Sequence, residues 1–363
     1  MQLKKIDILN YRNIENCELF FSPKINLFWG KNGMGKTNLL DAIYYLSFCK
    51  SHLNNIDSQL IRHNCDFFII QGEYNFIDGT HTISCAVKQR RKKQFLYDKK
   101  EYERIADHIG KIPLVLVSPA DTSLIIEGSD ERRRFMDIII SQYDKEYLNS
   151  LITYNTALQS RNALLKHPNN QDETMLEVLD EQLCATAEPI FEARNEFITK
   201  FIPVFKEFYR RIANNNETVE LSYISSLQTN RLKDKLLSSR EKDKYLGYTT
   251  AGIHKDDLEM LLNGFALKRT GSQGQNKSYL VAMKLAQFIF LKNISGKTPI
   301  LLLDDIFDKL DSERVERIIK EISDDNFGQI FITDTAREHI DKIIENNNKN
   351  FCLFAIEDGK VIK

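Results

Sequence analysis

A glycine-rich segment near the N-terminus has the residue types and spacing of a phosphate-binding loop. Residues 30–37 read GKNGMGKT, after the apolar run 25–29 and before leucine and isoleucine residues at helical spacing. A strand that turns at glycines and opens into a helix points several backbone N–H groups and the positive end of the helix dipole at one position. That position attracts polyphosphate, so the segment is predicted to be a nucleotide-binding P-loop.

Two side chains of this segment have separate predicted roles. Lys36 is expected to neutralise the β- and γ-phosphates as a point charge and to act in catalysis, and the Thr37 hydroxyl is expected to contact Mg²⁺. An accidental glycine-rich turn is the alternative, but the flanking strand and helix patterns argue against it. The residues of this segment expected to bind nucleotide are Gly30, Lys31, Asn32, Gly33, Met34, Gly35, Lys36, Thr37 and Asn38.

A pair of carboxylates late in the chain is the second candidate for chemistry. Residues 300–303 form a wholly apolar run, typical of a strand buried on both faces, and Asp304 and Asp305 follow it. Because the carboxyl ends of parallel strands face the ligand crevice, both side chains are expected beside the nucleotide. Asp304 is predicted to hold Mg²⁺, directly or through water, and Asp305 to act in catalysis on the water that attacks the γ-phosphate. A solvated acidic strand end is the alternative.

The third candidate segment reads SQGQ and comprises Ser272, Gln273, Gly274 and Gln275. It stands just ahead of a predicted helix that carries apolar residues on one side from Leu280 to Leu291. A serine and a glycine at a helix start form another anion-binding position. These four residues are therefore expected to form a second phosphate-binding helix start.

The elements that must position these residues divide the chain into three stretches. Residues up to about Leu116 are rich in strand patterns, residues 132–211 show apolar side chains at helical spacing, and sheet-like sequence returns after about Tyr248. We therefore predict an α/β fold in which a P-loop lobe, residues 1–125 and 248–363, receives a mostly helical lobe at 126–247. Pro189 and Pro203 are expected to start or kink helices in that lobe. The phenylalanine stripe, which comprises Phe197, Phe201, Phe205 and Phe208, is expected in its core.

Composition excludes several classes of protein. Hydrophobic residues make up 42% of the 363 residues and charged residues 28%, which is ordinary for a globular protein, and no apolar stretch is long enough to span a bilayer. The N-terminal residues lack the apolar segment of a secretion signal, so a cytoplasmic location is expected. The six cysteines are scattered without a C-x-x-C pair, so neither zinc nor disulfides are indicated.

The net charge of −1 means that a nucleic-acid partner would need a local basic surface. Two candidates exist. One is the run 88–93, KQRRKK, which continues to Lys99 and Lys100, and the other is the triplet 132–134, RRR. A solvated hairpin and a solvated helix face are the alternatives. Polar tracts at 214–216 and 346–350 are expected to be surface loops.

Taken together and in order, these motifs resemble the RecF family of DNA-repair ATPases, which is related to the head domains of SMC and ABC proteins. Besides GKNGMGKTN, SQGQ and LLLDDIFDKLD, the similar fragments are SPADTSLIIEGSDERRRFMD at 118–137, LQSRNALLK at 158–166 and GIHKDDL at 252–258. The resemblance covers nearly the full length. It implies an ABC/SMC-head-like ATPase lobe, with a mixed sheet and flanking helices, that binds ATP and Mg²⁺.

The resemblance also implies partners. An ATP-dependent homodimer is expected, in which Ser272 and the following residues act in trans and cover the ATP held by the other protomer's P-loop. Arg12 is implied as a further phosphate contact, although a surface charge is the plain alternative. DNA is expected to be held mostly through its phosphates, with little dependence on base sequence. Loading of a recombinase at single-strand gaps with RecO and RecR is a further implication.

Several positions depart from the pattern of related heads or stay unassigned. Where ABC transporters place a switch histidine at a strand end, only Thr333 and Asp334 are available, and Lys255 stands where arginine is expected. Asp305 is one methylene shorter than the glutamate of fast ABC ATPases, so slow hydrolysis is predicted. Leu310 and Asp311 would form the D-loop, and Asp311 is also a sound helix cap. Gln71 and Asp121 both remain candidates for the Gln-loop.

Three alternative functions have their own discriminators. An ABC transporter ATPase would show an L-S-G-G-Q signature, a switch histidine and no large helical insertion, and all three count against it. A small-molecule kinase shares the P-loop but does not require SQGQ ahead of LLLDD. A nucleotide-gated DNA-binding scaffold with negligible hydrolysis remains compatible with Asp305. SMC proteins carry hundreds of residues of coiled coil, which this chain cannot contain.

Overall fold

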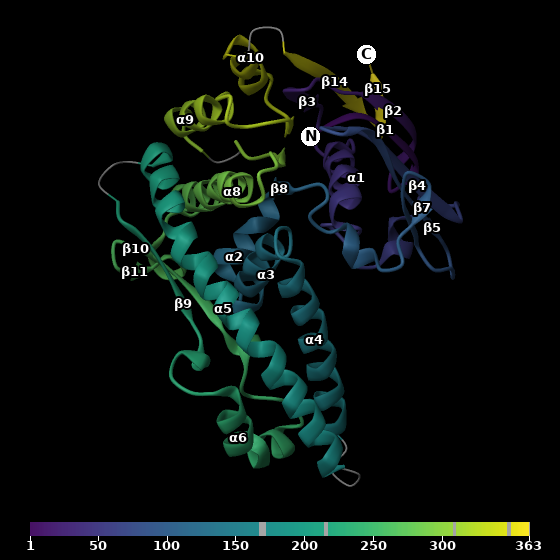
Figure 1. Cartoon of the computed structure of the whole chain (residues 1–363). Coiled ribbons are helices and arrows are strands. Elements are labelled where there is room, and N and C mark those ends of the chain that lie inside the picture. Colours follow the sequence, from purple (N-terminus) through teal and green to yellow (C-terminus); the bar gives the residue numbers. More distant parts are fainter. Residues whose placement is uncertain (167–171, 214–216, 308–309, 347–349, 363) are drawn as a thin grey trace. The chain divides into compact units, whose positions relative to one another are not determined.

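The computed structural model describes residues 1–363 except 167–171, 214–216, 308–309, 347–349 and 363 (Figure 1). The chain forms two compact units. Unit 1 comprises Met1–Asp121, Arg211–Ala213 and Gln273–Lys363, and unit 2 comprises Thr122–Arg210 and Asn214–Ser272. No described helix combines the length and the continuous apolar character that crossing a bilayer requires.

A mixed six-stranded sheet forms the centre of unit 1. Its strand order is β15 (Lys360–Ile362), β14 (Phe351–Glu357), β3 (Ile25–Trp29), β13 (Ile330–Asp334), β12 (Ile300–Asp304) and β8 (Leu114–Val117). All neighbours pair in parallel except β15, which is antiparallel to β14. β12 is buried along its whole length, as its apolar sequence predicts. The predicted mixed sheet is confirmed.

A second sheet of unit 1 is antiparallel throughout. Its order is β2 (Ile14–Phe20), β1 (Gln2–Tyr11), β4 (Phe67–Phe76), β5 (Gly79–Lys88), β6 (Gln94–Tyr97) and β7 (Lys100–Glu101). The helix α1 (Lys36–Phe48) contacts strands of both sheets and is buried on nearly every side. The P-loop helix is therefore a core element, which explains its many apolar residues.

The remaining elements of unit 1 flank these sheets. The α-helices are α8 (Gln273–Ser295), α9 (Ser312–Ile322) and α10 (Arg337–Asn346). Three short 3₁₀ helices are η1 (Asp57–Leu60), η2 (Ile105–His108) and η3 (Pro119–Thr122), the last of which ends one residue beyond this unit. α8 packs on β8 and is buried over most of its middle.

Unit 2 is mostly helical, as predicted, and also holds a three-stranded sheet. Its helices are α2 (Ser123–Ile126), α3 (Ser129–Ile140), α4 (Lys145–Leu165), α5 (Glu173–Ile212, whose last two residues belong to unit 1), α6 (Leu232–Leu246) and α7 (Leu267–Thr270). The sheet order is β11 (Phe265–Ala266), β10 (Asp257–Leu262) and β9 (Val219–Ile224), and the 3₁₀ helices are η5 (Ser226–Gln228) and η6 (Ile253–Lys255).

The boundary at which the chain leaves this lobe differs from the predicted 248. Residues 248–272 belong to unit 2, because β10 pairs with β9 across six registered positions. The sheet-like sequence after Tyr248 therefore completes the inserted lobe. The predicted loop 214–216 and residues 347–349 of the predicted loop 346–350 lie outside the described residues, and Asn346 is the last residue of α10.

Pro189 and Pro203, which are predicted to start or kink helices, do not start new helices. Both prolines lie inside α5, which runs for 40 residues without interruption (Figure 1). Each proline removes one backbone N–H and thus leaves the carbonyl four residues earlier without its helical donor. Both prolines are exposed, so water can reach this side of the helix. The opposite side buries the phenylalanine stripe, which confirms its place in the core.

Two buried arginines organise the charges of unit 2. Arg161 is fully buried and binds Asp180 at 2.6 Å and Asp243 at 2.8 Å. Arg194 binds Asp137 at 2.8 Å and Asp256 at 3.1 Å. Asp137, Arg161 and Asp256 lie in the family-like fragments, so each buried arginine joins such a fragment to another part of the lobe.

Candidate nucleotide-binding site

The P-loop joins the end of β3 to the start of α1, in the setting that its sequence predicts. Gly35 precedes the helix with a φ of 106°, a conformation that favours glycine. A Cβ atom at Gly30 would collide with the carbonyl oxygen of Ile356 on β14. Two of the glycines are therefore required by the backbone path itself.

Two neighbouring turns hold the loop in place. The N–H of Gly359, in the turn between β14 and β15, donates to the carbonyl oxygen of Met34 at 2.8 Å. Asn13, in the turn between β1 and β2, donates from Nδ2 to the same oxygen at 3.4 Å. Asn38 donates to Oδ1 of Asn13 at 2.7 Å. The sequence does not predict this support, because it comes from residues distant along the chain.

Lys36 points back over the loop. Its ammonium donates to the carbonyl oxygens of Gly30 at 2.8 Å and Lys31 at 3.0 Å, and the residue is only 4% exposed. These bonds place a positive charge within the ring of loop backbone where the sequence predicts phosphate. The arrangement agrees with the expected role of Lys36 as a point charge.

Asp304 connects three elements at the end of the central sheet. Its Oδ1 accepts from the Thr37 hydroxyl at 3.0 Å and from the Thr333 hydroxyl at 2.6 Å. Thr37 opens α1, and Thr333 lies on β13 beside Asp304 on β12. Burial raises the pKa of Asp304, and the two hydroxyl bonds oppose that shift. The predicted metal ligands Thr37 and Asp304 are thus brought together.

The oxygen atoms at this position fit a magnesium ion. Mg²⁺ prefers hard oxygen ligands and is commonly bound by one or two carboxylates together with substrate phosphates. A buried carboxylate whose pKa is raised by desolvation gains from a nearby cation. The Thr37 hydroxyl and the Asp304 carboxylate supply such ligands beside the P-loop.

Asp305 follows Asp304 with its backbone bent out of the strand. Its φ is 44°, in the left-handed region that aspartate tolerates better than most residues. The backbone N–H of Asp305 donates to the Thr333 hydroxyl at 3.0 Å and to the Thr333 carbonyl oxygen at 3.3 Å.

Arg12 lies against the first turns of α1. Its φ is 53°, its guanidinium donates to Asn38 at 3.2 Å, and its Nε lies 3.8 Å from Asp41. Asp41 is 3% exposed and also accepts from the hydroxyls of Tyr11 and Ser51, each at 2.6 Å. The implied phosphate contact is therefore next to the P-loop, and a buried carboxylate that sequence reasoning missed holds it there.

The SQGQ segment opens α8, since the helix begins at Gln273 directly after Ser272. The motif therefore forms the first turn of α8, whereas the sequence pattern predicts the motif just before the helix. A Cβ atom at Gly274 would meet the guanidinium of Arg314 on α9, and Arg314 binds Asp311 at 3.4 Å. Asp311 also caps α9 by accepting from the N–H of Arg314, which confirms its predicted capping role. The signature and the D-loop segment are thus neighbours.

The two Gln-loop candidates lie in different surroundings. Gln71 pairs with Asp7 and Ser84 in the antiparallel sheet. Asp121 follows β8 of the central sheet, accepts from the N–H of Ser118 at 2.6 Å and binds Lys284 on α8 at 2.7 Å. Since β8 is the neighbour of β12, Asp121 is the better placed of the two.

Lys255 lies over the ring of Tyr248 at 5.3 Å, within unit 2.

A histidine near the end of β13 is a functional candidate that the sequence pattern does not indicate. The expected position of a switch residue is the strand end itself, whereas His339 lies further along the chain on α10. Its Nδ1 lies 2.8 Å from Oδ2 of Asp334, and its ring is 5.3 Å from the ring of Phe307. Asp334 is opposite Trp29, the last residue before the P-loop. His339 is thus a candidate sensor that only the fold reveals.

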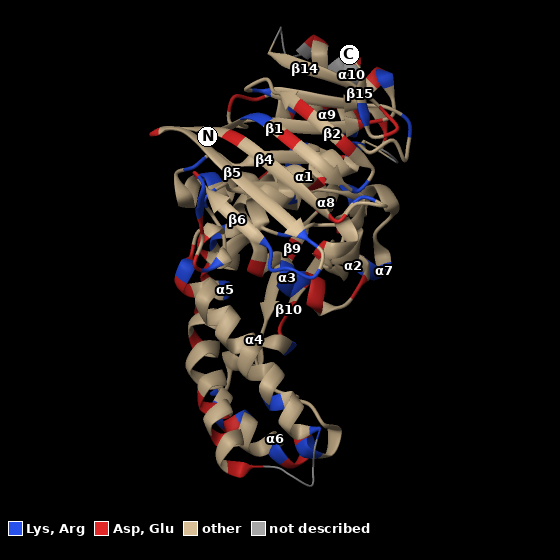
Figure 2. Ribbon diagram, turned by 90° about the vertical axis from the view of Figure 1, so that its right-hand side faces the viewer, with Lys and Arg blue, Asp and Glu red and all other residues tan. Residues whose placement is uncertain are grey.

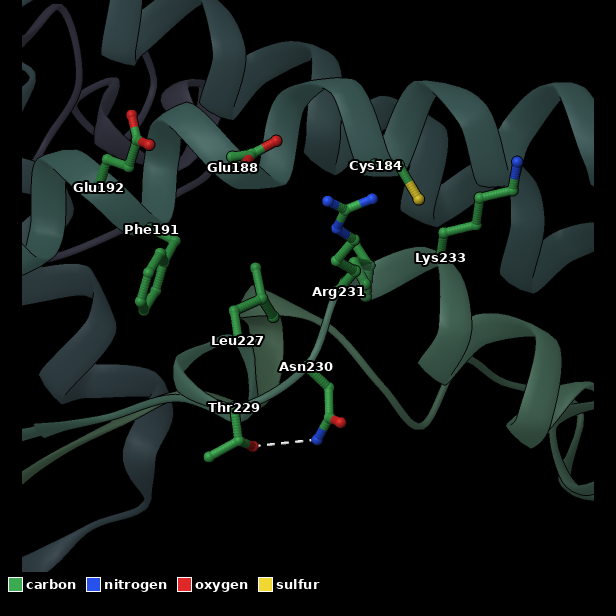
Figure 3. A pocket seen from close by; sticks show the side chains of 10 residues that line it. Cys184, Glu188, Phe191, Glu192, Leu227, Thr229, Asn230, Arg231 and Lys233 are labelled. Carbon is green, nitrogen blue, oxygen red and sulfur yellow. Dashed lines mark hydrogen bonds between the residues drawn. The ribbon is translucent and has the colours of Figure 1, made fainter.

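A separate pocket of about 670 Å³ lies within unit 2, between α5 and the segment that leads into α6 (Figure 3). Glu188 and Glu192 line it from α5, and Arg231 and Lys233 line it from the other segment. Because charges of both signs line the pocket, it has no marked preference for phosphate. We assign it no ligand.

Comparison with known proteins agrees with this geometry. Residues 2–360 match the family model of the RecF/RecN/SMC N-terminal domain. The DNA replication and repair protein RecF of Phocaeicola vulgatus is 57% identical over 363 residues, which cover 99% of this chain and 98% of the relative.

Solved structures show the same relationship. The recombination mediator protein RecF-ATP in the RecFOR pathway is 31% identical, with a TM-score of 0.89 and coverage of 100% of this chain and 97% of that one. An Smc head domain from Pyrococcus furiosus is 17% identical, with a TM-score of 0.58 and coverage of 99% and 96%, and shows the shared fold alone. The chain belongs to the RecF family of DNA replication and repair proteins, with the ABC-like ATPase head fold that this family shares with SMC proteins.

Proposed function

We propose that the chain is an ATP-dependent DNA-binding protein of recombinational repair that works as a head-to-tail homodimer. Each protomer holds one ATP on its P-loop, and Ser272 to Gln275 of the other protomer cover it. The contact of Thr37 with Asp304, 3.0 Å between oxygens, carries this proposal, because it joins the P-loop to the acidic strand end that ATP hydrolysis requires.

The residues of one protomer have distinct tasks in this proposal. Lys36 and the loop N–H groups bind the β- and γ-phosphates, and Arg12 adds a cation beside them. Thr37 and Asp304 hold Mg²⁺, which neutralises phosphate charge when bound. Asp305 orients the attacking water and accepts its proton. The short side chain of Asp305 makes hydrolysis slow.

Slow ATP hydrolysis would set how long the dimer stays on DNA. ATP binding closes the dimer on DNA, at junctions of single-stranded and double-stranded DNA, and hydrolysis opens it. A relative from the RecFOR pathway is described with ATP, which supports ATP as the nucleotide and RecR and RecO as partners in recombinase loading. In this proposal the protein acts in the cytoplasm, and DNA stimulates its ATPase activity. The transporter alternative is not favoured, since the similar relatives are RecF proteins.

Measuring the mass of the purified chain by light scattering tests the dimer. We expect a monomer without nucleotide and a dimer with ATP and Mg²⁺. Lys36→Arg should weaken nucleotide binding by the P-loop. Ser272→Arg adds a large charged side chain at the position that is proposed to cover the partner's ATP. Each variant alone should therefore stay monomeric. A dimer that persists with Ser272→Arg contradicts the trans assignment, and a monomer at saturating ATP for the unmodified chain contradicts the dimer.

A nucleotide-gated scaffold with negligible hydrolysis is the second candidate function. The half-buried Asp305, in place of a longer glutamate, favours it. Single-turnover kinetics with labelled ATP separates the two functions. Conversion to ADP that Asp305→Asn abolishes supports the ATPase, and conversion that is equally slow in both proteins supports the scaffold.

A further inference from the structure

The turn between β5 and β6 gathers exposed cations beside an apolar hollow. Lys88, Arg90, Arg91 and Lys92 are all exposed, and Figure 2 shows the Lys and Arg residues at the end of β5. A groove of about 480 Å³ adjoins the turn, and its lining residues are Phe67, Ile69, Ala86, Val87, Lys88, Arg91, Lys92 and Gln94. The groove lies entirely within unit 1, and no P-loop residue lines it.

The strand register explains the groove. Phe67 on β4 is directly opposite Lys88 on β5, and two positions along, Ala86 stands between Ile69 on β4 and Gln94 on β6. Residues two apart share one face of a sheet, so these side chains project from the same side. The small side chain of Ala86 leaves a hollow between larger neighbours. Phe67 is 37% exposed at one end of it.

The charges of the turn are available to a ligand. Among the residues that the structure describes, no ion pair involves Lys88, Arg90, Arg91 or Lys92. Lys93 behaves differently, because it turns inward and binds the Cys49 carbonyl at 2.6 Å and Asp57 at 2.8 Å. This half-buried lysine holds the turn against the body of the unit.

Few acidic groups oppose these cations. Asp66 is exposed near the turn, where its carbonyl oxygen accepts from the N–H of Gln89. Further along the same sheet, Lys5 pairs with Asp7 and Glu18. The basic turn is thus a local positive surface on a chain whose net charge is −1.

We propose that this groove and turn bind a segment of single-stranded DNA, which deepens the proposed function and rests on it. The cations contact successive phosphates, and a base stacks on Phe67 and enters the groove above Ala86. Sites for single strands combine a positive track with an exposed aromatic ring. In a duplex the bases are already stacked inside, so the apolar groove would gain nothing from it.

Fluorescence anisotropy tests the proposal with the full chain, ATP, Mg²⁺ and a labelled oligothymidylate of about 16 nucleotides. Phe67→Ala should weaken binding about tenfold, the loss of one stacked base, with an unchanged salt slope. Ala86→Phe fills the groove without changing charge and should weaken binding similarly. A duplex of the same length, measured in parallel, should be affected less by both variants.

A matched pair of charge variants tests the phosphate contacts. Arg91→Gln with Lys92→Gln should reduce the slope of log K against log salt by about 1.4, two contacts on a single strand. Lys99→Gln with Lys100→Gln removes the same charge from the turn at the other end of β6 and should leave that slope unchanged. Thermal unfolding checks that every variant remains folded.

The possible results separate the inference from the proposed function. If both charge pairs reduce the slope equally, or if Phe67→Ala weakens duplex binding more than single-strand binding, this surface is not the single-strand site, whereas the ATP-dependent DNA binding stands. If the unmodified chain binds neither DNA at any ATP concentration, the proposed function itself fails.

Discussion

At the residue scale, Asp304 is a carboxylate whose charged form is disfavoured by burial, although its proposed role in binding Mg²⁺ requires that charge. Burial raises its pKa above the ordinary value of 3.8, so the folded chain favours the protonated form more than the unfolded chain does. Its contribution to stability is therefore present at low pH and is lost as pH rises through the raised pKa. The charged form of Asp304 is the less favourable one in this buried position, and a cation beside it would offset that penalty.

Asp304→Asn should separate these two properties. An amide oxygen can still accept from Thr37 and Thr333, since both hydroxyls bind the same atom, Oδ1. We expect a variant with a higher Tm than the unmodified chain at neutral pH, because the amide carries no charge that burial can penalise. Its ATP hydrolysis should be abolished, because the charge that is proposed to hold Mg²⁺ is gone.

Thermal unfolding across a pH series measures the effect. The difference in Tm between Asp304→Asn and the unmodified chain should grow as pH rises through the raised pKa of Asp304. Thr333→Val is the control, since it removes one hydrogen bond to Asp304 and leaves the charge. An Asn variant less stable than the unmodified chain at neutral pH would show that the buried charge is already compensated within the fold.

At the element scale, α5 shows how packing outweighs local preference. A proline inside a helix removes a hydrogen bond and opposes the carbonyl four residues earlier, at a penalty of about 3 kcal/mol. One side of α5 buries Phe197, Phe201 and Phe205, all at 1% exposure or less. Burial of each such side chain contributes about 1.5–3 kcal/mol, so the continuous helix prevails over its two exposed prolines.

Pro189→Ala should therefore stabilise unit 2. Alanine restores the N–H to the helix and removes the ring, while it returns some entropy to the unfolded chain, so a net gain of about 1–2 kcal/mol is expected. Denaturant unfolding followed by circular dichroism measures it. Glu188→Ala, an exposed neighbour, should change stability by less than about 0.5 kcal/mol. A loss of stability with Pro189→Ala would mean that the ring makes favourable contacts.

The basic triplet 132–134 also shows that tertiary contacts decide what a local sequence pattern does. Arg132 binds Asp257 at 2.6 Å, Arg133 donates to the Asp256 carbonyl at 2.6 Å, and Arg134 lies 3.6 Å from Glu131. Three charges that read as a possible nucleic-acid surface are thus engaged within unit 2. The run 88–93 has a similar basic character but lies in a turn, and it retains four cations without an ion pair among the described residues.

At the scale of the whole molecule, the proposed site is complete only when two copies meet. The P-loop variant Lys36→Arg keeps an intact SQGQ segment, and Ser272→Arg keeps an intact P-loop. In a mixed dimer, one composite site is broken twice and the other is intact. Composite sites of this kind follow from the pairing of two different surfaces of one chain.

Mixing the two variants should therefore restore ATP hydrolysis that neither has alone. Because each variant alone stays monomeric, only mixed dimers form, and one of the two composite sites in each is intact, so at most about half of the unmodified rate is expected. Release of phosphate measures it. A mixture that contains Lys36→Arg and the doubly substituted chain is the control and should stay inactive. Inactivity of the first mixture, with dimers present, would contradict catalysis in trans.

The sequence by itself determined the parts whose chemistry is local. The glycines and Lys36 of the P-loop, the buried strand before Asp304 and the helix cap at Asp311 all depend on residues within a few positions, so their spacing predicts them. The mixed sheet and the family followed from the order of such motifs. The roles of the site residues remain predictions that the experiments above test.

Only the tertiary structure decided which distant residues meet. Asp41 behind Arg12, His339 beside Asp334 and the turn at Gly359 on the P-loop involve partners from other elements, and no local pattern encodes such pairings. The continuity of α5 and the place of residues 248–272 in unit 2 were decided in the same way. In each case, burial and long-range hydrogen bonds exceed the local preferences that a sequence displays.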